Sequence, residues 1–287
     1  MLERNGYPPG VPCWVDTTQP DPDAAAGFYG GLFGWRFEDR MPADVPGRYL
    51  VAQLRGRDVG AIGSQPDGAP AQAMWNTYVW VESADEAAAK AAAAGGTVVT
   101  APFDVMDAGR MAVLADPGGA VFCVWQARAH RGAQLVNEPN TWNWSDLNTR
   151  DLGAAREFYG GVFGWEAKAL DADENAPTMW CVPGYGKFLS KNDPSLYERL
   201  DEYEAPEGFA DAVGWLQPMP EEQFPADVPP HWHVTFSVDD ADGSAERVQE
   251  LGGEVTVPPM DVPWVRLAVL RDPQGAAFTV GQFVPPG

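Results

Sequence analysis

The sequence has few of the features that mark secreted or membrane-spanning proteins. Only three cysteines occur in 287 residues, Cys13, Cys123 and Cys181, and they are too few and too scattered for a disulfide framework. No apolar run is long enough to cross a bilayer, and the N-terminal MLERNGYPPG lacks the apolar core of a signal peptide. We therefore expect a cytoplasmic protein with no membrane partner.

Basic residues are also scarce. Lysine and arginine together number 19 against 41 aspartates and glutamates, which gives a formal net charge of -22. Phosphate groups would be repelled by such a surface, so the composition argues against nucleic acid and anionic membranes as partners. The same charge would concentrate a cationic small molecule near the protein, although solubility alone also accounts for it.

The chain does contain a long internal repeat. FYGGLFGW at 28–35 returns as FYGGVFGW at 158–165, and at the same offset Trp14 matches Trp144 and Asp16 matches Asp146. The ends of the halves match as well, with GGTV at 95–98 against GGEV at 252–255, and 110–126 against 266–282. The chain is therefore two copies of one unit. We expect domains at 1–130 and 131–287, because hydrophobic patterning lapses near 129–140.

Each half is predicted to contain one strand–helix–strand–strand–strand unit twice. In the first half we expect strands at 12–18, 35–37, 49–54 and 58–62, with a helix at 24–33 between the first two. Asp and Pro at 20–23 favour the start of that helix, and Gly34 favours its end. The second unit has strands at 76–81, 97–100, 110–115 and 120–126 around a helix at 84–94. The chain is thus predicted to be an α+β protein of four βαβββ modules.

The halves differ by a longer insert in the second, near 186–230. This segment is acidic and rich in proline, yet it carries Tyr197, Tyr203, Phe209, Trp215 and Phe224. A disordered linker would contain few aromatic residues. We therefore expect a packed loop or lid over the second half.

The tandem βαβββ order, the two FYGGxFGW helix ends, and DPGGAVF and DPQGAAF before each last strand resemble the vicinal oxygen chelate superfamily of glyoxalases, bleomycin-resistance proteins and extradiol dioxygenases. The resemblance covers nearly the whole chain and is greatest to duplicated bacterial members of about this size, described as glyoxalase-like or hydroxylase-type, some of which accompany anthracycline biosynthesis. It implies two open-barrel, cup-like domains in tandem. One such architecture serves several chemistries, so the fold alone does not give the function.

The resemblance also implies where metal ligands would lie if this chain had them. The first-strand position falls on Trp14 and Trp144, the strand that opens each second module offers Asn76 and His233, and the last strand offers Cys123 and Thr279. The remaining position falls at 60–62 or 213–215, where no ligand type stands out. Neither half supplies the histidine and carboxylate set of a catalytic divalent metal, so we expect no metal and no other cofactor. A two-histidine site at His231 and His233 stays open beside the reading that both line a pocket.

Strand alternation predicts which side chains share each cup, because residues two apart face the same side. For the first cup these candidates are Trp14, Asp16, Asn76, Tyr78, Trp80, Cys123 and Trp125. For the second they are Trp142, Trp144, Asp146, His231, His233, Thr235 and Thr279, with Trp215 from the insert. Aromatic walls with one carboxylate suit a flat ligand, neutral or cationic. The tryptophans could equally fill two small barrels.

Two functions fit this pattern. The first is a metal-independent binding protein that holds a planar aromatic metabolite, as an accessory or self-resistance factor in natural-product metabolism. The second is a hydroxylase, isomerase, lyase or glyoxalase-like enzyme that uses Asp146 and His233 for acid–base chemistry. The second half is the favoured site under both, because both of these histidines and the insert belong to it. A monomer or a homodimer is compatible with either function.

Overall fold

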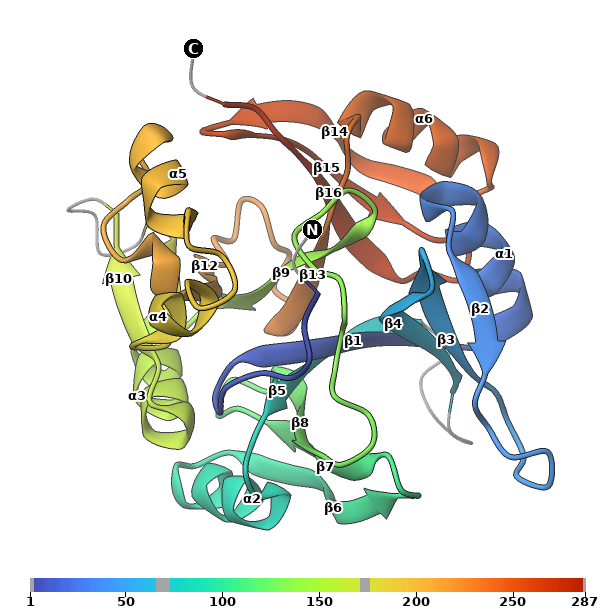
Figure 1. Ribbon diagram of the computed structural model, residues 1–287, viewed down its shortest axis with the longest axis horizontal. Helices are drawn as coiled ribbons and strands as arrows, with labels where there is room; N and C mark the ends of the chain where they lie inside the picture. Colours follow the sequence, from blue (N-terminus) through green and yellow to red (C-terminus); the bar gives the residue numbers. More distant parts are fainter. Residues whose placement is uncertain (1–2, 66–72, 171–175, 286–287) are drawn as a thin grey trace.

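The computed structural model describes residues 3–65, 73–170 and 176–285. Its strands form two eight-stranded mixed sheets, one from each half of the chain (Figure 1). The first sheet contains β1 (Pro12–Gln19), β2 (Arg36–Asp39), β3 (Tyr49–Leu54), β4 (Arg57–Ser64), β5 (Met74–Trp80), β6 (Thr97–Val105), β7 (Gly109–Ala115) and β8 (Val121–Ala127). The second contains β9 (Thr141–Thr149), β10 (Glu166–Ala169), β11 (Thr178–Cys181), β12 (Ala212–Pro218), β13 (His231–Ser237), β14 (Glu254–Val262), β15 (Val265–Arg271) and β16 (Ala277–Phe283).

The strand order shows how the modules combine. The first sheet runs β2-β3-β4-β1-β5-β8-β7-β6, and the second repeats that order as β10-β11-β12-β9-β13-β16-β15-β14. In each sheet the opening strands of the two modules, β1 with β5 and β9 with β13, pair antiparallel at the centre. Neither sheet closes on itself. The predicted α+β fold of four βαβββ modules is therefore confirmed.

The helices begin and end where local chemistry predicts. Helix α1 (Pro22–Phe33) starts at Asp21, whose side chain accepts a hydrogen bond from the amide of Ala24, and ends at Gly34 with φ of 71°. Helix α3 (Leu152–Phe163) has the same caps one repeat later. The second module of each half contributes α2 (Ala84–Ala93) and α6 (Ala241–Glu250). None of the helices in the described ranges is long and apolar enough to cross a membrane.

The repeated FYGGxFGW segment lies at the contact between the halves rather than in a cup. Tyr29 on α1 donates a hydrogen bond to Asp272, which follows β15 in the other half, at 2.9 Å. Tyr159 on α3 donates in the same way to Asp116, at 3.2 Å. Figure 1 shows the exchange: α1 (blue) lies beside α6 of the second half, and α3 (yellow-green) lies near α2 of the first. One aromatic core therefore continues through both halves.

The glycine pair that follows α2 and α6 belongs to the same contact. Gly95 and Gly252 adopt φ of +87° and +85°, which favours glycine. The next residue needs to be small for another reason. A Cβ at Gly96 would lie 2.7 Å from the ring of Phe158, and one at Gly253 would lie 3.1 Å from the ring of Phe28. Close approach between the halves thus explains the second part of the repeat.

The insert differs in form from the expected continuous segment at 186–230. It contains α4 (Tyr185–Leu189), α5 (Leu196–Glu202) and the short 3-10 helix η1 (Phe209–Asp211), after which β12 re-enters the sheet beside β9. A second loop at 219–230 then leads to β13. The guanidinium of Arg150 fastens this loop by donating to the carbonyls of Met219, Phe224, Pro225 and Val228. The expected insert is therefore two loops separated by a strand, and Trp215 belongs to that strand.

Candidate functional site

The polar side chains at the centre of the first sheet satisfy one another. Asp16 on β1 is buried and accepts hydrogen bonds from Asn76 at 2.9 Å, from Tyr78 at 2.7 Å and from Tyr49 at 3.1 Å. Tyr49 in turn accepts a hydrogen bond from the indole of Trp14 at 3.0 Å. Burial raises the pKa of Asp16, and the three donors oppose that rise. Each oxygen of this carboxylate is thus already occupied by the protein.

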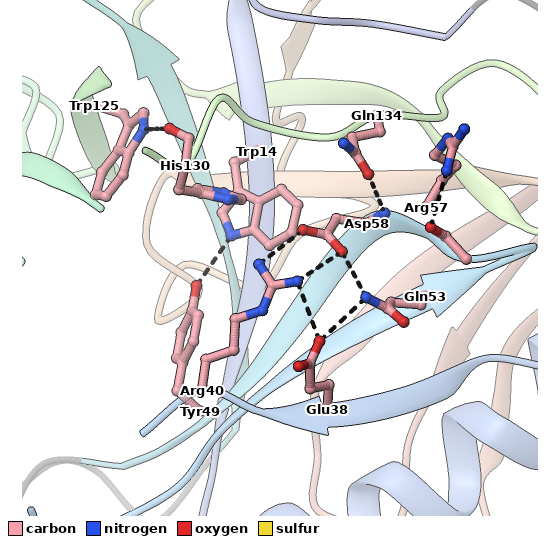
Figure 2. A network of polar contacts seen from close by, with 11 residues as sticks. Trp14, Glu38, Arg40, Tyr49, Gln53, Arg57, Asp58, Trp125, His130 and Gln134 are labelled. Carbon is pink, nitrogen blue, oxygen red and sulfur yellow. Dashed lines mark hydrogen bonds and ion pairs between the residues drawn. The ribbon is translucent and has the colours of Figure 1, made fainter. Parts of the chain in front are cut away.

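The connector between the halves, residues 128–140, lies beside Trp14 of this network and beside Asp58 (Figure 2). The ring of His130 lies edge-on to Trp14, with centroids 4.4 Å apart, and 5.7 Å from the ring of Trp125. The indole of Trp125 donates to the carbonyl of His130 at 3.0 Å, and Gln134 further along accepts from the amide of Asp58. Nε2 of His130 is buried without a hydrogen-bond partner in the described structure. Burial lowers the pKa of His130 to about 4, so the ring is neutral at pH 7.

The other first-half candidates lie around this centre. Cys123 on β8 stands opposite Tyr78 in the strand register, and burial raises the pKa of its thiol. Trp80, at the end of β5, contacts Tyr7 from the N-terminal segment, with ring centroids 6.3 Å apart. Sequence reasoning placed these residues on one sheet but missed Tyr49 and His130. His130 was missed because it lies in a segment with no counterpart in the repeat.

The corresponding carboxylate of the second half is almost unpartnered. Asp146 on β9 lies between His233 of β13 and Trp215 of β12 in the strand register. Its side chain accepts one hydrogen bond from a described residue, from the amide of Trp215 at 3.2 Å. Asp146 is partly buried, and burial raises its pKa to about 7. Asp16 therefore has three side-chain donors where Asp146 has only a backbone amide.

His233 is the register partner of Asp146, and His231 lies two residues earlier on the same strand, opposite Asn148. Nε2 of His233 is 2.8 Å from the hydroxyl of Thr279 on β16, and Nδ1 of His231 is 2.9 Å from the carbonyl of Pro229. Burial, with a smaller contribution from His231, lowers the pKa of His233 to about 4. Thr235 follows on the same face, as the register partner of both Thr279 and Trp144. No hydrogen bond joins the side chains of Asp146 and His233.

Aromatic residues of the insert extend across this face. Phe209 of η1 meets the ring of Trp144 edge-on at 5.9 Å, and Trp215 joins the same apolar cluster. Beyond α5, Tyr203 lies 5.1 Å from the ring of Phe283 at the end of β16. The insert leaves the sheet after β11 and rejoins it at β12, yet Tyr203 reaches β16, which lies three strands from β12 in the sheet order. The insert therefore spans the face that carries Asp146 and His233. Helices α4 and α5 lie on the left in Figure 1.

Trp142 differs from its expected place. A bulge separates it from Trp144, so that Trp144 pairs with Thr235 while Trp142 pairs with Phe236. Phe236 belongs to the aromatic core between the halves, and the buried Trp142 indole donates to Ser145 on that side at 3.2 Å. The bulge shifts the alternation by one residue. Trp142 is therefore a core residue that does not share the face of Asp146.

This architecture, two cup-like α+β domains of paired βαβββ modules, is that of the vicinal oxygen chelate superfamily. The family model described as a glyoxalase-like domain matches residues 14–125 and 144–281, and the chain belongs to this family. Both halves of the repeat are thus separate copies of the same domain.

Named relatives match the chain along nearly its full length. A Mycobacterium tuberculosis protein named as a glyoxylase, CFP32, is 39% identical over 98% of this chain and 97% of its own. The anthracycline biosynthesis protein DnrV of Streptomyces peucetius is 33% identical over 96% of this chain and 94% of its own. Among solved structures, an Mn(II)-bound glyoxalase from Novosphingobium aromaticivorans has a TM-score of 0.59 at 15% identity, covering 95% of this chain and 82% of that one. The 2,3-dioxygenase LapB from Pseudomonas sp. KL28 has a TM-score of 0.57 at 12% identity, covering 97% and 95%. These structures share the fold.

A divalent metal does not fit the side chains at the family's ligand positions. Trp144, His233 and Thr279 do lie on neighbouring strands of the second sheet, as the resemblance implies. Of the three, only His233 carries a common metal ligand, and its Nε2 is hydrogen-bonded to Thr279. In the described residues no three His, Cys, Asp or Glu side chains gather to hold an ion.

Proposed function

We propose that the second half binds a planar aromatic metabolite without a metal, as an accessory or self-resistance factor in natural-product metabolism. The observation that carries this proposal is the unequal treatment of two equivalent carboxylates. Asp16 is buried and receives three side-chain hydrogen bonds, whereas Asp146 is partly buried and receives one backbone hydrogen bond. A partly buried carboxyl group without side-chain partners is a natural contact for a ligand.

Aromatic side chains around Asp146 favour a flat ligand. Trp144, Trp215 and Phe209 lie on one side of the carboxyl group, in the cluster that the insert completes. A stacked ring or a cation over such a surface contributes about 0.5–2 kcal/mol. A ligand that also carries an amine would hold Asp146 in its charged form. The names of two relatives, which refer to anthracycline biosynthesis, agree with a polycyclic ligand of this kind.

Calorimetric titration with an anthracycline that bears an amino sugar, and with its uncharged aglycone, tests the proposal. We expect saturable binding of both, and Trp144→Ala should weaken both at least tenfold because it removes an aromatic contact. Asp146→Asn should weaken only the amine-bearing compound. Trp80→Ala, which changes a partly buried tryptophan of the first half, should leave both affinities unchanged. Unaltered binding in Trp144→Ala and Asp146→Asn would contradict the proposal.

A second candidate is an enzyme that moves a proton with the same residues. It is favoured by the pKa of Asp146, about 7, next to His233, whose low pKa keeps the ring neutral. A carboxyl group that titrates near neutral pH is suited to general acid–base chemistry. The two functions are separated by repeating the titration in heavy water and measuring the mass and the deuterium content of the recovered ligand. Unchanged ligand indicates binding, and converted or deuterated ligand, lost in Asp146→Asn, indicates catalysis.

A further inference from the structure

A cavity of about 530 Å³ lies where β9 passes into α3, away from the Asp146 face. Its lining includes Thr149, Arg150 and Arg156 from the start of α3 and the strand before it, and Pro218 and Met219 from the end of β12 and the loop after it. Arg156 has no hydrogen bond or ion pair with a described residue. Arg150 donates to four carbonyl groups and meets no carboxylate among the described residues. In a chain of net charge -22, the guanidinium of Arg156 thus faces this cavity without a carboxylate partner among the described residues.

The first half shows what fills the equivalent place. There Gln274, at the turn before β16, exchanges two hydrogen bonds with the backbone of Asp21, at 2.7 and 2.8 Å. Gln19 reaches the same turn and donates to Asp272 at 2.7 Å. Two glutamine side chains thus occupy the notch at the start of α1.

The start of α3 has neither glutamine. The position of Gln19 is taken by Thr149, and the position of Gln274 is taken by Gly118. A Cβ on Gly118 would lie 3.3 Å from a carboxylate oxygen of Asp116, 3.5 Å from the ring of Pro230 and 3.6 Å from the hydroxyl of Thr149, so the turn that contains this glycine lies beside Thr149. The same comparison puts Arg150 where the first half has Pro20, and Arg156 where it has Ala26. The start of α3 therefore lacks both glutamines and carries two arginines where the start of α1 has Pro20 and Ala26.

We propose that this cavity binds a small organic carboxylate. The guanidinium of Arg156 matches a carboxylate in shape and charge, and Pro218, Met219 and Leu152 provide apolar contact for the ligand body. Asp151 also lines the cavity, but its carboxylate accepts the amide hydrogen of Ala154 as the cap of α3. The lining therefore holds the unpartnered guanidinium of Arg156, the guanidinium of Arg150, which is committed to backbone carbonyl groups, and one committed carboxylate. This site is separate from the Asp146 face and does not depend on the function proposed for it.

Calorimetric titration of the full chain with benzoate, and in parallel with inorganic phosphate, tests the proposal. We expect benzoate to bind at one site and Arg156→Gln to weaken it at least tenfold, because the charge-assisted hydrogen bonds are lost. Arg36→Gln, which removes an exposed arginine of the first half, should have no effect, and neither should Asp146→Asn or Trp144→Ala.

Three results would overturn the proposal. They are the absence of benzoate binding at millimolar concentration, equal losses in Arg156→Gln and Arg36→Gln, and phosphate binding without benzoate binding. Thermal denaturation of each variant confirms that it is folded before its affinity is compared. The absence of benzoate binding would not contradict the function proposed for the Asp146 site, because variants of that site are tested with a different ligand.

Discussion

At the scale of single residues, the two carboxylates show how duplication separates roles. Asp16 and Asp146 occupy the same place in two copies of one sheet, yet their surroundings differ in hydrogen-bond donors. Asn76 and Tyr78 of the first half correspond to His233 and Thr235 in the second. His233 and Thr235 make no hydrogen bond to Asp146. The second carboxyl group is therefore left with burial as the main influence on its pKa.

Asp146→Asn should raise the free energy of unfolding at pH 8 but not at pH 4. The folded-state pKa, about 7, lies above the ordinary value of 3.8, so the folded protein retains this proton between those values while the unfolded chain releases it. The protonated Asp146 side chain therefore contributes its full stabilisation of the folded state below pH 4, and this contribution is lost as the pH rises through 7. Removing the ionisable group should stabilise the protein at pH 8 by an amount on the order of 2 kcal/mol.

Urea denaturation at both pH values measures this difference, and the first half supplies the control. Asp16→Asn should lower the stability at pH 8, because its amide nitrogen would face donors that now point at a carboxylate. A stabilising effect of Asp16→Asn equal to that of Asp146→Asn would contradict the assigned difference between the two sites. His233 acts with the opposite sign, since its lowered pKa adds stability as the pH rises from 4 to 6.5. Both variants retain His233, so its contribution cancels.

At the scale of elements, sequence patterns predicted regular segments well because their signals are local. The caps of α1 and α3 and the tight turns after β7 and β15 depend on residues within a few positions of one another. The strand alternation failed at Trp142 because a bulge depends on the partner strand. The role of the connector could not be predicted from the sequence for a similar reason. Its irregular sequence resembles a linker, and only the folded sheet shows that His130 meets Trp14 and Trp125.

The connector should behave as a structural cover whose ring matters more than its charge. His130→Ala should lower the free energy of unfolding by about 1–3 kcal/mol at pH 8, since it removes ring contacts with Trp14 and Trp125. His130→Phe keeps a ring and replaces the unpartnered Nε2, so we expect little loss. The lowered pKa of His130 means that its neutral form stabilises the fold above pH 6.5 and that this is lost toward pH 4. Both variants should therefore show a smaller loss of stability on acidification than the parent.

At the scale of the whole molecule, the repeat explains why the halves form one body. The Phe–Tyr pair of each half packs on the other half, and the glycine pairs at 95–96 and 252–253 allow that approach. The sequence established the duplication and the four modules, but not that the repeated motif is an interface. A motif shared by two copies looks the same whether it serves a binding site or their mutual contact. The residues of the candidate binding site were harder to predict, because the two halves carry different side chains around Asp16 and Asp146.

Gly96→Ala should therefore destabilise both halves together. Its Cβ would lie 2.7 Å from the ring of Phe158 and 2.7 Å from the carbonyl of Ala115, so α3 of the second half has to shift. We expect a loss of about 1–3 kcal/mol and one calorimetric transition at a lower temperature, because the core is continuous. Gly27→Ala is the matched control. It lies exposed within α1 with nothing within 4 Å of the added Cβ, and it should stabilise the protein by about 0.5–1 kcal/mol. If Gly96→Ala shows two separate transitions and only one of them moves to lower temperature, the halves fold independently. The aromatic contacts that they exchange would then not couple them.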